Sequence, residues 1–199
     1  MFAHIFSKFN VFIISVGILT SCSSPLESPF YRSEEVTVGQ KEIIESEFGK
    51  DAEYQIITLF YNPLTGNFIN VSMRRVPGQG MLENWNYSHT PVKTGRSYRR
   101  FKIGSVAMWE KTSEKFPDNR NLLFFKVSDI PWTQIPAWFA SVSKDMVKRG
   151  SERPEVDMIS FQKNSNEGLV AYINAETEGG GSSLRYTLNM EGKLVREPE

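Results

Sequence analysis

Short strands joined by hairpin turns are the feature that most constrains the fold of this chain. In the C-terminal part, runs rich in β-branched and aromatic residues alternate with brief segments of Asn, Gly and Ser. Connections this short join neighbouring antiparallel strands and leave no room for a crossover helix. Predicted strands lie at 156–163, 169–177, 184–190 and 193–196, and predicted turns at 164–168, 179–181 and 191–192. These residues therefore predict an antiparallel meander.

The N-terminal part shows the same pattern and adds helices. Predicted strands lie at 54–61, 68–76, 85–89, 97–103 and 122–127. Amphipathic spacing predicts helices at 38–48, 105–116 and 133–149. Gly49 and Gly150 follow the first and last of these helices, where glycine commonly ends a helix. The expected fold class is α+β, with one or more antiparallel sheets packed against two main helices.

An offset of 102 residues aligns the two parts of the chain: Thr58 then meets Ser160, and Gly66 meets Gly168. The match suggests a tandem duplication with halves at 37–104 and 105–199, and chance matching of common hairpin residues is the alternative. The layout is similar to the tandem αβββ arrangement of PepSY-like and β-lactamase-inhibitor-like domains. That likeness concerns the fold alone and does not imply a function.

Residues 1–21 have the parts of a secretory signal. Lys8 and the amino terminus carry positive charge, an apolar run follows at 11–19, and Ser21 precedes Cys22, the only cysteine. The apolar run is far shorter than the roughly 20 residues that a spanning helix needs. Leu19-Thr20-Ser21-Cys22 resembles the lipobox of bacterial lipoproteins. The alternative is an ordinary secreted protein with an incidental cysteine.

The lipobox resemblance implies cleavage before Cys22 and lipidation of that cysteine, with palmitate among the acyl chains. It places the protein in the bacterial cell envelope, and Ser23 rather than Asp at the next position implies the outer membrane. We expect the protein to face the periplasm. Residues 22–36 are then the lipidated cysteine and a flexible tether, and 37–199 form a single α+β domain.

Charge and residue types argue against several functions. The chain has 23 basic and 23 acidic side chains, and this balance disfavours a dedicated nucleic-acid binder. Lipidated Cys22 offers no thiol, and His89 is the only histidine beyond the leader. A Ser-His-Asp triad or a multi-histidine metal site is therefore not expected. No cofactor or metal is expected beyond the lipid on Cys22.

A basic stretch interleaved with aromatic residues is the strongest local charge feature. Its members are Lys93, Arg96, Arg99, Arg100 and Lys102, with Arg74 and Arg75 expected on a neighbouring strand. Guanidinium groups match phosphate and carboxylate groups, so this stretch is a candidate site for lipid headgroups or anionic wall polymers. The alternative is a solvated strand whose charges protect a sheet edge.

Trp132 and Trp138 lie in an apolar segment that leads into the last predicted helix. If exposed, they are candidate anchors for a partner protein; the alternative is that they pack the helix onto its sheet.

The expected function is that of a membrane-anchored envelope lipoprotein that binds another envelope protein, as an assembly factor or a scaffold. The alternatives are an enzyme that cleaves cell-wall or surface glycan with paired carboxylates, and a carrier of lipid or anionic polymer.

Overall fold

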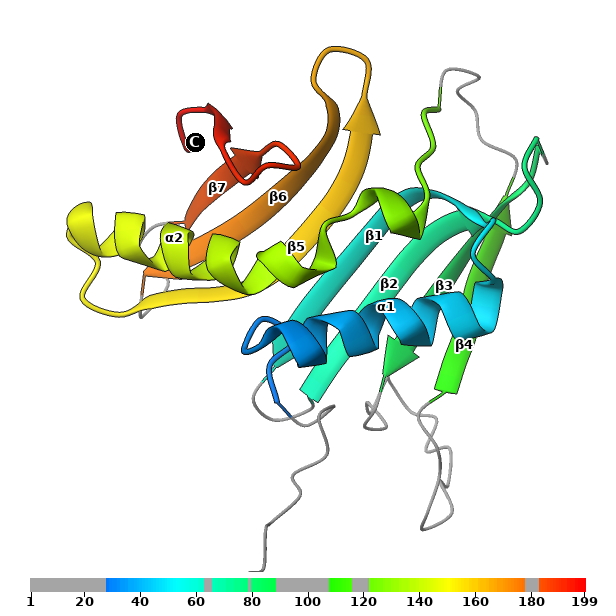
Figure 1. Ribbon diagram of the computed structural model, residues 1–199, viewed down its shortest axis with the longest axis horizontal. Helices are drawn as coiled ribbons and strands as arrows, with labels where there is room; N and C mark the ends of the chain where they lie inside the picture. Colours follow the sequence, from blue (N-terminus) through cyan, green and yellow to red (C-terminus); the bar gives the residue numbers. More distant parts are fainter. Residues whose placement is uncertain (1–27, 63–65, 79, 89–107, 116–121, 178–182) are drawn as a thin grey trace, which may run out of the picture.

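The computed structural model describes residues 28–62, 66–78, 80–88, 108–115, 122–177 and 183–199. They form two layers, an antiparallel eight-stranded sheet and two helices on one of its faces (Figure 1). The helices are α1 (Glu34–Phe48) and α2 (Ile135–Lys148), and the short 3-10 turns η2 (Val127–Asp129) and η3 (Trp132–Gln134) precede α2. The strands are β1 (Glu53–Asn62), β2 (Gly66–Arg74), β3 (Leu82–Ser88), β4 (Met108–Lys115), β5 (Pro154–Asn164), β6 (Gly168–Thr177), β7 (Ser183–Leu188) and β8 (Leu194–Arg196). The expected α+β class is confirmed.

The strand order is β4-β3-β2-β1-β5-β6-β7-β8, so β1 and β5 join the two sides of the sheet at its centre. Thr58 of β1 lies opposite Ser160 of β5, and their hydroxyl oxygens are 2.9 Å apart. Helix α1 covers the side formed by the strands that follow it, and α2 covers the side that begins with β5 (Figure 1). Each hairpin-connected run of strands thus lies beneath the helix that precedes it.

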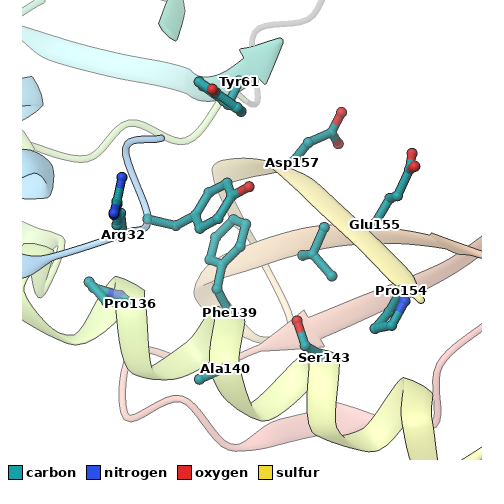
Figure 2. A pocket seen from close by; sticks show the side chains of 11 residues that line it. Arg32, Tyr61, Pro136, Phe139, Ala140, Ser143, Pro154, Glu155 and Asp157 are labelled. Atoms are coloured by element: carbon teal, nitrogen blue, oxygen red, sulfur yellow. The ribbon is translucent and has the colours of Figure 1, made fainter. Parts of the chain in front are cut away.

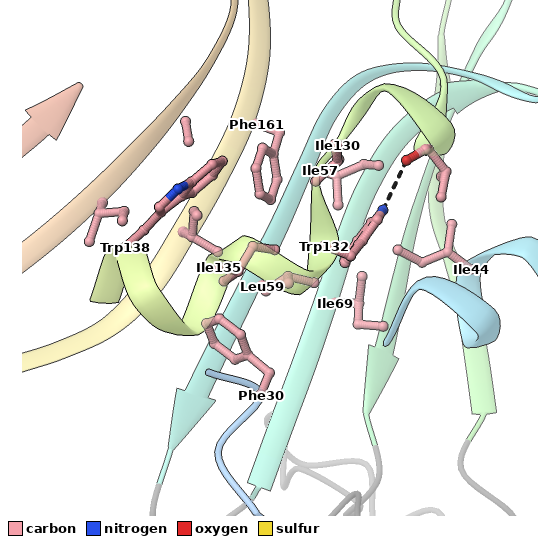
Figure 3. Packing of buried hydrophobic residues seen from close by; sticks show 14 of the residues in the cluster. Phe30, Ile44, Ile57, Leu59, Ile69, Ile130, Trp132, Ile135, Trp138 and Phe161 are labelled. Atoms are coloured by element: carbon pink, nitrogen blue, oxygen red, sulfur yellow. Dashed lines mark hydrogen bonds between the residues drawn. The ribbon is translucent and has the colours of Figure 1, made fainter. Parts of the chain in front are cut away.

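The hydrophobic core fills the space between the helices and the sheet. Trp132 lies in this layer, where its Nε1 donates a hydrogen bond to the carbonyl oxygen of Val127 at 2.9 Å (Figure 3). Ile57 of β1 and Phe161 of β5 are fully buried nearby. One continuous cluster of buried apolar side chains contains residues from both sides of the sheet. Because burying each large side chain contributes about 1.5–3 kcal/mol, the two sides stabilise each other through a shared core.

The helix predicted at 105–116 is wrong, because residues 108–115 form the edge strand β4. Trp109 packs against Phe48 of α1 and Tyr87 of β3, with ring centroids 4.7 and 5.2 Å apart. The exposed edge of β3 provides backbone partners along the whole segment, and this tertiary pairing outweighs the local helical spacing. Four strands therefore follow α1, and the predicted boundary between 104 and 105 wrongly separates β4 from β3.

The strand predicted at 122–127 is reduced to a single β-bridge. Pairing between β1 and β5 ends at Ile56, which leaves the backbone of Tyr54 without a neighbour on that side. Phe125 fills this place, with N–H···O distances of 2.8 and 3.0 Å to Tyr54. The chain then turns into η2 instead of continuing as a strand.

The folded domain begins earlier than the predicted boundary at residue 37. Phe30 is fully buried, its backbone N–H donates to Asn67 Oδ1 at 2.9 Å, and its carbonyl accepts from Thr37 Oγ1 at 2.8 Å. Ser33 caps α1, accepting a hydrogen bond from the backbone of Val36. The tether predicted over 22–36 is therefore wrong for residues 28–36, because a buried aromatic ring and two buried hydrogen bonds fix this segment to β2 and α1.

Candidate binding pocket

A pocket of about 570 Å³ opens where α2, the start of β5 and the segment before α1 meet (Figure 2). Its lining residues are Tyr31, Arg32, Tyr61, Pro136, Phe139, Ala140, Ser143, Pro154, Glu155, Val156 and Asp157. This volume is within the range of small-ligand sites, about 300–1,000 Å³. The pocket therefore has the size to hold a small molecule or a short segment of a partner.

Aromatic rings form one part of the pocket. Tyr31 stacks on Phe139 with ring centroids 4.6 Å apart and an interplanar angle of 4°. Tyr61 meets Tyr31 edge-on, at 6.2 Å and 89°. Phe139 is buried, whereas both tyrosines are half-buried, so each keeps ring surface available to a ligand. Aromatic surface of this kind can bind apolar groups, sugar faces or cations.

Charged groups of opposite sign lie on different sides of these rings. Arg32 is exposed on the side of the N-terminal segment, and Glu155 and Asp157 project from β5 on the other side (Figure 2). Asp157 occupies a bulge, where the pairing of β5 with β6 shifts between Val156 and Met158. The pocket therefore offers distinct ends to a ligand.

The pKa of Asp157 is raised above its ordinary value. Burial is the largest cause; the negative charges of Glu176 and Glu155 also raise it, and a hydrogen bond with its own backbone partly offsets them. Glu176 lies on β6 directly opposite Glu155. Like charges in this cross-strand position repel, so a cation at this end of the pocket would relieve the repulsion.

The arginines predicted to bind anions are held by carboxylates and rings of the protein itself. Arg74 forms an ion pair with Glu53 and lies over the ring of Phe124, 3.8 Å from its centroid. Arg75 lies over the rings of Phe48 and Trp85 at 5.0 and 5.2 Å. Both guanidinium groups thus have structural contacts. The other members of the predicted patch lie outside the described residues; they are Lys93, Arg96, Arg99, Arg100 and Lys102. His89 and the glycine run 179–181 also lie outside the described residues.

Glu83 is the centre of a small ion-pair network under α1. Its carboxylate accepts a hydrogen bond from Trp85 Nε1 at 2.8 Å and pairs with Lys111 and Arg75, each at 3.4 Å. Burial alone would raise the pKa of Glu83, but these hydrogen bonds and positive charges together lower it. The network therefore favours the charged carboxylate in the folded state.

We expect Glu83→Gln to lower the free energy of unfolding by about 1–2 kcal/mol at pH 7, because it weakens hydrogen bonds to a charged group. A lowered pKa in the folded state means that this contribution is fully present above the ordinary value of 4.5 and is lost as the pH falls through the folded value. Urea denaturation at several pH values measures it. A difference between wild type and variant that stays constant from pH 7 to strongly acidic pH would contradict this account.

Trp132 and Trp138, the predicted partner anchors, are each 4% exposed. Trp132 lies in the core described above, and Trp138 packs under the turn between β7 and β8. Neither can reach a partner in this conformation, because helix, strand and turn residues cover them. Their positions correspond to the alternative interpretation, packing of α2 and its preceding turn onto the sheet.

Sequence patterns did not single out the residues of the pocket. Tyr31 and Arg32 fell within the predicted tether, and Glu155 and Asp157 looked like ordinary charges at the start of a strand. The only local signal is the pair of acidic residues just after Pro154. Only the folded structure shows that these acidic residues line a pocket, because the pairing of β1 with β5 brings Tyr61 beside them.

No group of three or more His, Cys, Asp or Glu side chains in the described part of the chain is placed to hold a metal ion. Among the same residues, no helix has both the length and the apolar character needed to cross a membrane.

Comparison with known proteins gave no match: no protein-family model, no curated protein and no solved structure corresponds to this chain.

Proposed function

We propose that this chain is a lipid-anchored module of the bacterial cell envelope that binds another envelope protein through the pocket beside α2. Support for the anchor comes from the lipobox resemblance at Cys22. Support for binding comes from the pocket, whose size, aromatic rings and separated charges suit recognition of a ligand. None of its described lining residues is a histidine, the side chain that most often serves as a general base.

The placement of the carboxylates is the single observation that most favours binding over glycan cleavage. A glycosidase needs two carboxyl groups that flank the scissile bond from opposite sides. Here Glu155 and Asp157 project from the same strand, and the facing wall is formed by Arg32 and α2 residues such as Phe139 and Ser143. Among the described lining residues, no second carboxylate stands across the pocket from Asp157.

A glycan-cleaving enzyme is nevertheless the second candidate, because the raised pKa of Asp157 suits a general acid. Hydrolysis of cell-wall glycan by the purified protein, lost in Asp157→Asn, would favour this candidate.

The third candidate is a carrier of lipid or anionic polymer. It depends on the basic stretch 93–102 and stays a prediction, since that stretch lies outside the described residues.

Cys22→Ala should release the protein from the membrane without unfolding the domain. The described core begins at Phe30 and is built from residues that follow the cysteine, so we expect loss of the acyl chains to remove only the anchor. A protein held by two or more chains is stably bound, whereas one without them is not. Membrane fractionation, with limited proteolysis to confirm folding, measures this. A folded variant that still sediments with membranes would refute the lipid anchor.

In-cell cross-linking of the tagged protein, followed by mass spectrometry, tests the binding role. We expect one abundant envelope protein linked to residues around the pocket. Recovery of glycan or lipid without a protein partner would reject the binding role in favour of the second or third candidate.

We also infer that the two sides of the sheet are copies of one helix-and-meander unit. The bulge in β1 lies between Tyr54 and Ile56, and the bulge in β5 lies between Val156 and Met158, which is the same 102-residue offset that separates the paired Thr58 and Ser160. The buried positions of the helices follow this offset too: Val36, Thr37, Gln40 and Ile44 of α1 correspond to Trp138, Phe139, Val142 and Met146 of α2. A related chain with its two bulges at non-equivalent positions would contradict the duplication.

A further inference from the structure

The acidic end of the pocket carries charge that the described part of the protein does not neutralise. Glu155 and Glu176 face each other across β5 and β6, and Asp157 lies beside them in the bulge. Within the described residues, none of the three carboxylates forms an ion pair with a basic side chain, although the protein pairs many of its other acidic residues in this way. Three neighbouring carboxylates without a cation destabilise a fold, which suggests that something other than stability maintains them.

In the corresponding bulge of β1, the same backbone irregularity carries side chains that bond to one another. There Glu53 lies opposite Arg74 and forms an ion pair with it. Gln55 occupies the bulge position and accepts a hydrogen bond from Ser72. By the 102-residue offset, Glu53, Gln55 and Arg74 correspond to Glu155, Asp157 and Glu176. Within the described residues, the two equivalent bulges thus carry a neutral, mutually bonded set on one side of the sheet and an unpaired acidic set on the other. Two members of the acidic set, Glu155 and Asp157, line the pocket.

The rings of the pocket strengthen the preference for a cation. Tyr31 is close enough to Asp157 for the carboxylate charge to contribute to the raised pKa of the tyrosine, after burial and the neighbouring Tyr61. A positive group held by Asp157 would therefore also lie near the faces or hydroxyls of these tyrosines. Lysine and arginine bind aromatic faces as well as carboxylates, and their apolar stems suit the rest of the wall.

We propose that the pocket binds a lysine or arginine side chain on an extended peptide segment of the partner, with Asp157 and Glu155 holding the basic group and Tyr31 and Tyr61 contacting its stem. This inference rests on the proposed function and names the chemistry of the bound partner. The pocket volume of about 570 Å³ exceeds what one side chain fills, so neighbouring residues of the segment enter with it. Arg32, on the opposite side (Figure 2), is placed to donate hydrogen bonds to a backbone carbonyl of that segment.

The test uses the full chain in a neutral detergent and two peptides that differ in one group. Acetyl-Ala-Arg-Ala-amide is the probe, and the same peptide with citrulline is its uncharged counterpart of nearly equal shape. Ligand-observed NMR titration gives the two dissociation constants. We expect the arginine peptide to bind at least tenfold more tightly, and we expect Glu155→Gln combined with Asp157→Asn to abolish that preference. Glu53→Gln, beside the equivalent bulge of β1 and outside the pocket, should leave the preference unchanged.

Stability measurements separate a binding role of these carboxylates from a structural one. Because the acidic set has no cation to lose, the double variant should unfold at the same urea concentration as the wild type or at a higher one. Glu53→Gln, which breaks an ion pair, should unfold at a lower concentration. A double variant that binds less and is also clearly less stable would overturn the proposal, since the carboxylates would then act through the fold.

Several outcomes would overturn this proposal without touching the proposed function. Equal affinity for the two peptides, or no detectable binding of either, would do so. Tighter binding of a glucosamine trimer would overturn the proposed function as well, because it would assign the pocket to an amino-sugar polymer. If cross-linking finds an envelope protein whose yield the double variant does not change, the binding role stands and the basic-peptide assignment fails. A folded Cys22→Ala variant retained on membranes would instead reject the anchor, whatever the peptides do.

Discussion

Gly192→Ala should lower the free energy of unfolding by about 3 kcal/mol. Gly192 lies in the turn between β7 and β8 with a φ of +76°, and a Cβ placed there would come within 2.2 Å of Nε1 of Trp138. The left-handed conformation alone costs a residue with a Cβ about 1–2 kcal/mol. Because Trp138 is only 4% exposed, we expect the clash to add an overpacking cost of about 1–3 kcal/mol.

Gly168→Ala is the matched control, because Gly168 also has a positive φ, +75°, in a hairpin turn, but its Cβ would meet no atom within 4 Å. It should therefore lose only the conformational part, about 1–2 kcal/mol. Urea denaturation of both variants measures the difference. Equal losses would show that the turn can shift away from Trp138 and that the contact does not restrain it.

Turn chemistry made most of the sheet predictable from sequence. The hairpin between β5 and β6 is an example: Asn164 and Gly168 mark it in the sequence, and the structure pairs these two residues at the end of the hairpin. A helix was also expected at 133–149, and the structure has α2 there, with Pro136 in its first turn. These features depend on local backbone preferences, which a sequence displays directly.

The features that could not be predicted depend on contacts between distant segments. Val106, Trp109 and Phe116 have helical spacing in the sequence, yet residues 108–115 pair with β3 as a strand. Residues 28–33 contain Pro29 and lack periodicity, yet Phe30 is buried by partners that only the folded sheet brings near. The pocket is the extreme case, since its walls come from four separate segments of the chain, and Asp157 reaches it through a bulge that no sequence pattern signals.

Phe30→Ala should lower the free energy of unfolding by about 3–4 kcal/mol, the usual cost of the cavity left by a large buried aromatic ring. Phe30 is fully buried and its ring meets Tyr31 and Phe139 edge-on, with centroids 5.2 and 5.3 Å away. Since Tyr31 stacks on Phe139 in the pocket, the variant should also weaken binding of the arginine peptide. Urea denaturation and the peptide titration measure the two effects separately.

Phe60→Ala is a useful comparison, because Phe60 is half-buried on β1 and contacts Phe68 rather than the pocket. It should cost less than Phe30→Ala and leave peptide binding unchanged. If residues 28–36 were a flexible tether, Phe30→Ala would cost nothing and a chain beginning at residue 37 would be as stable as the full chain. The structure requires the opposite for both, because residues 28–36 complete the core and one wall of the pocket.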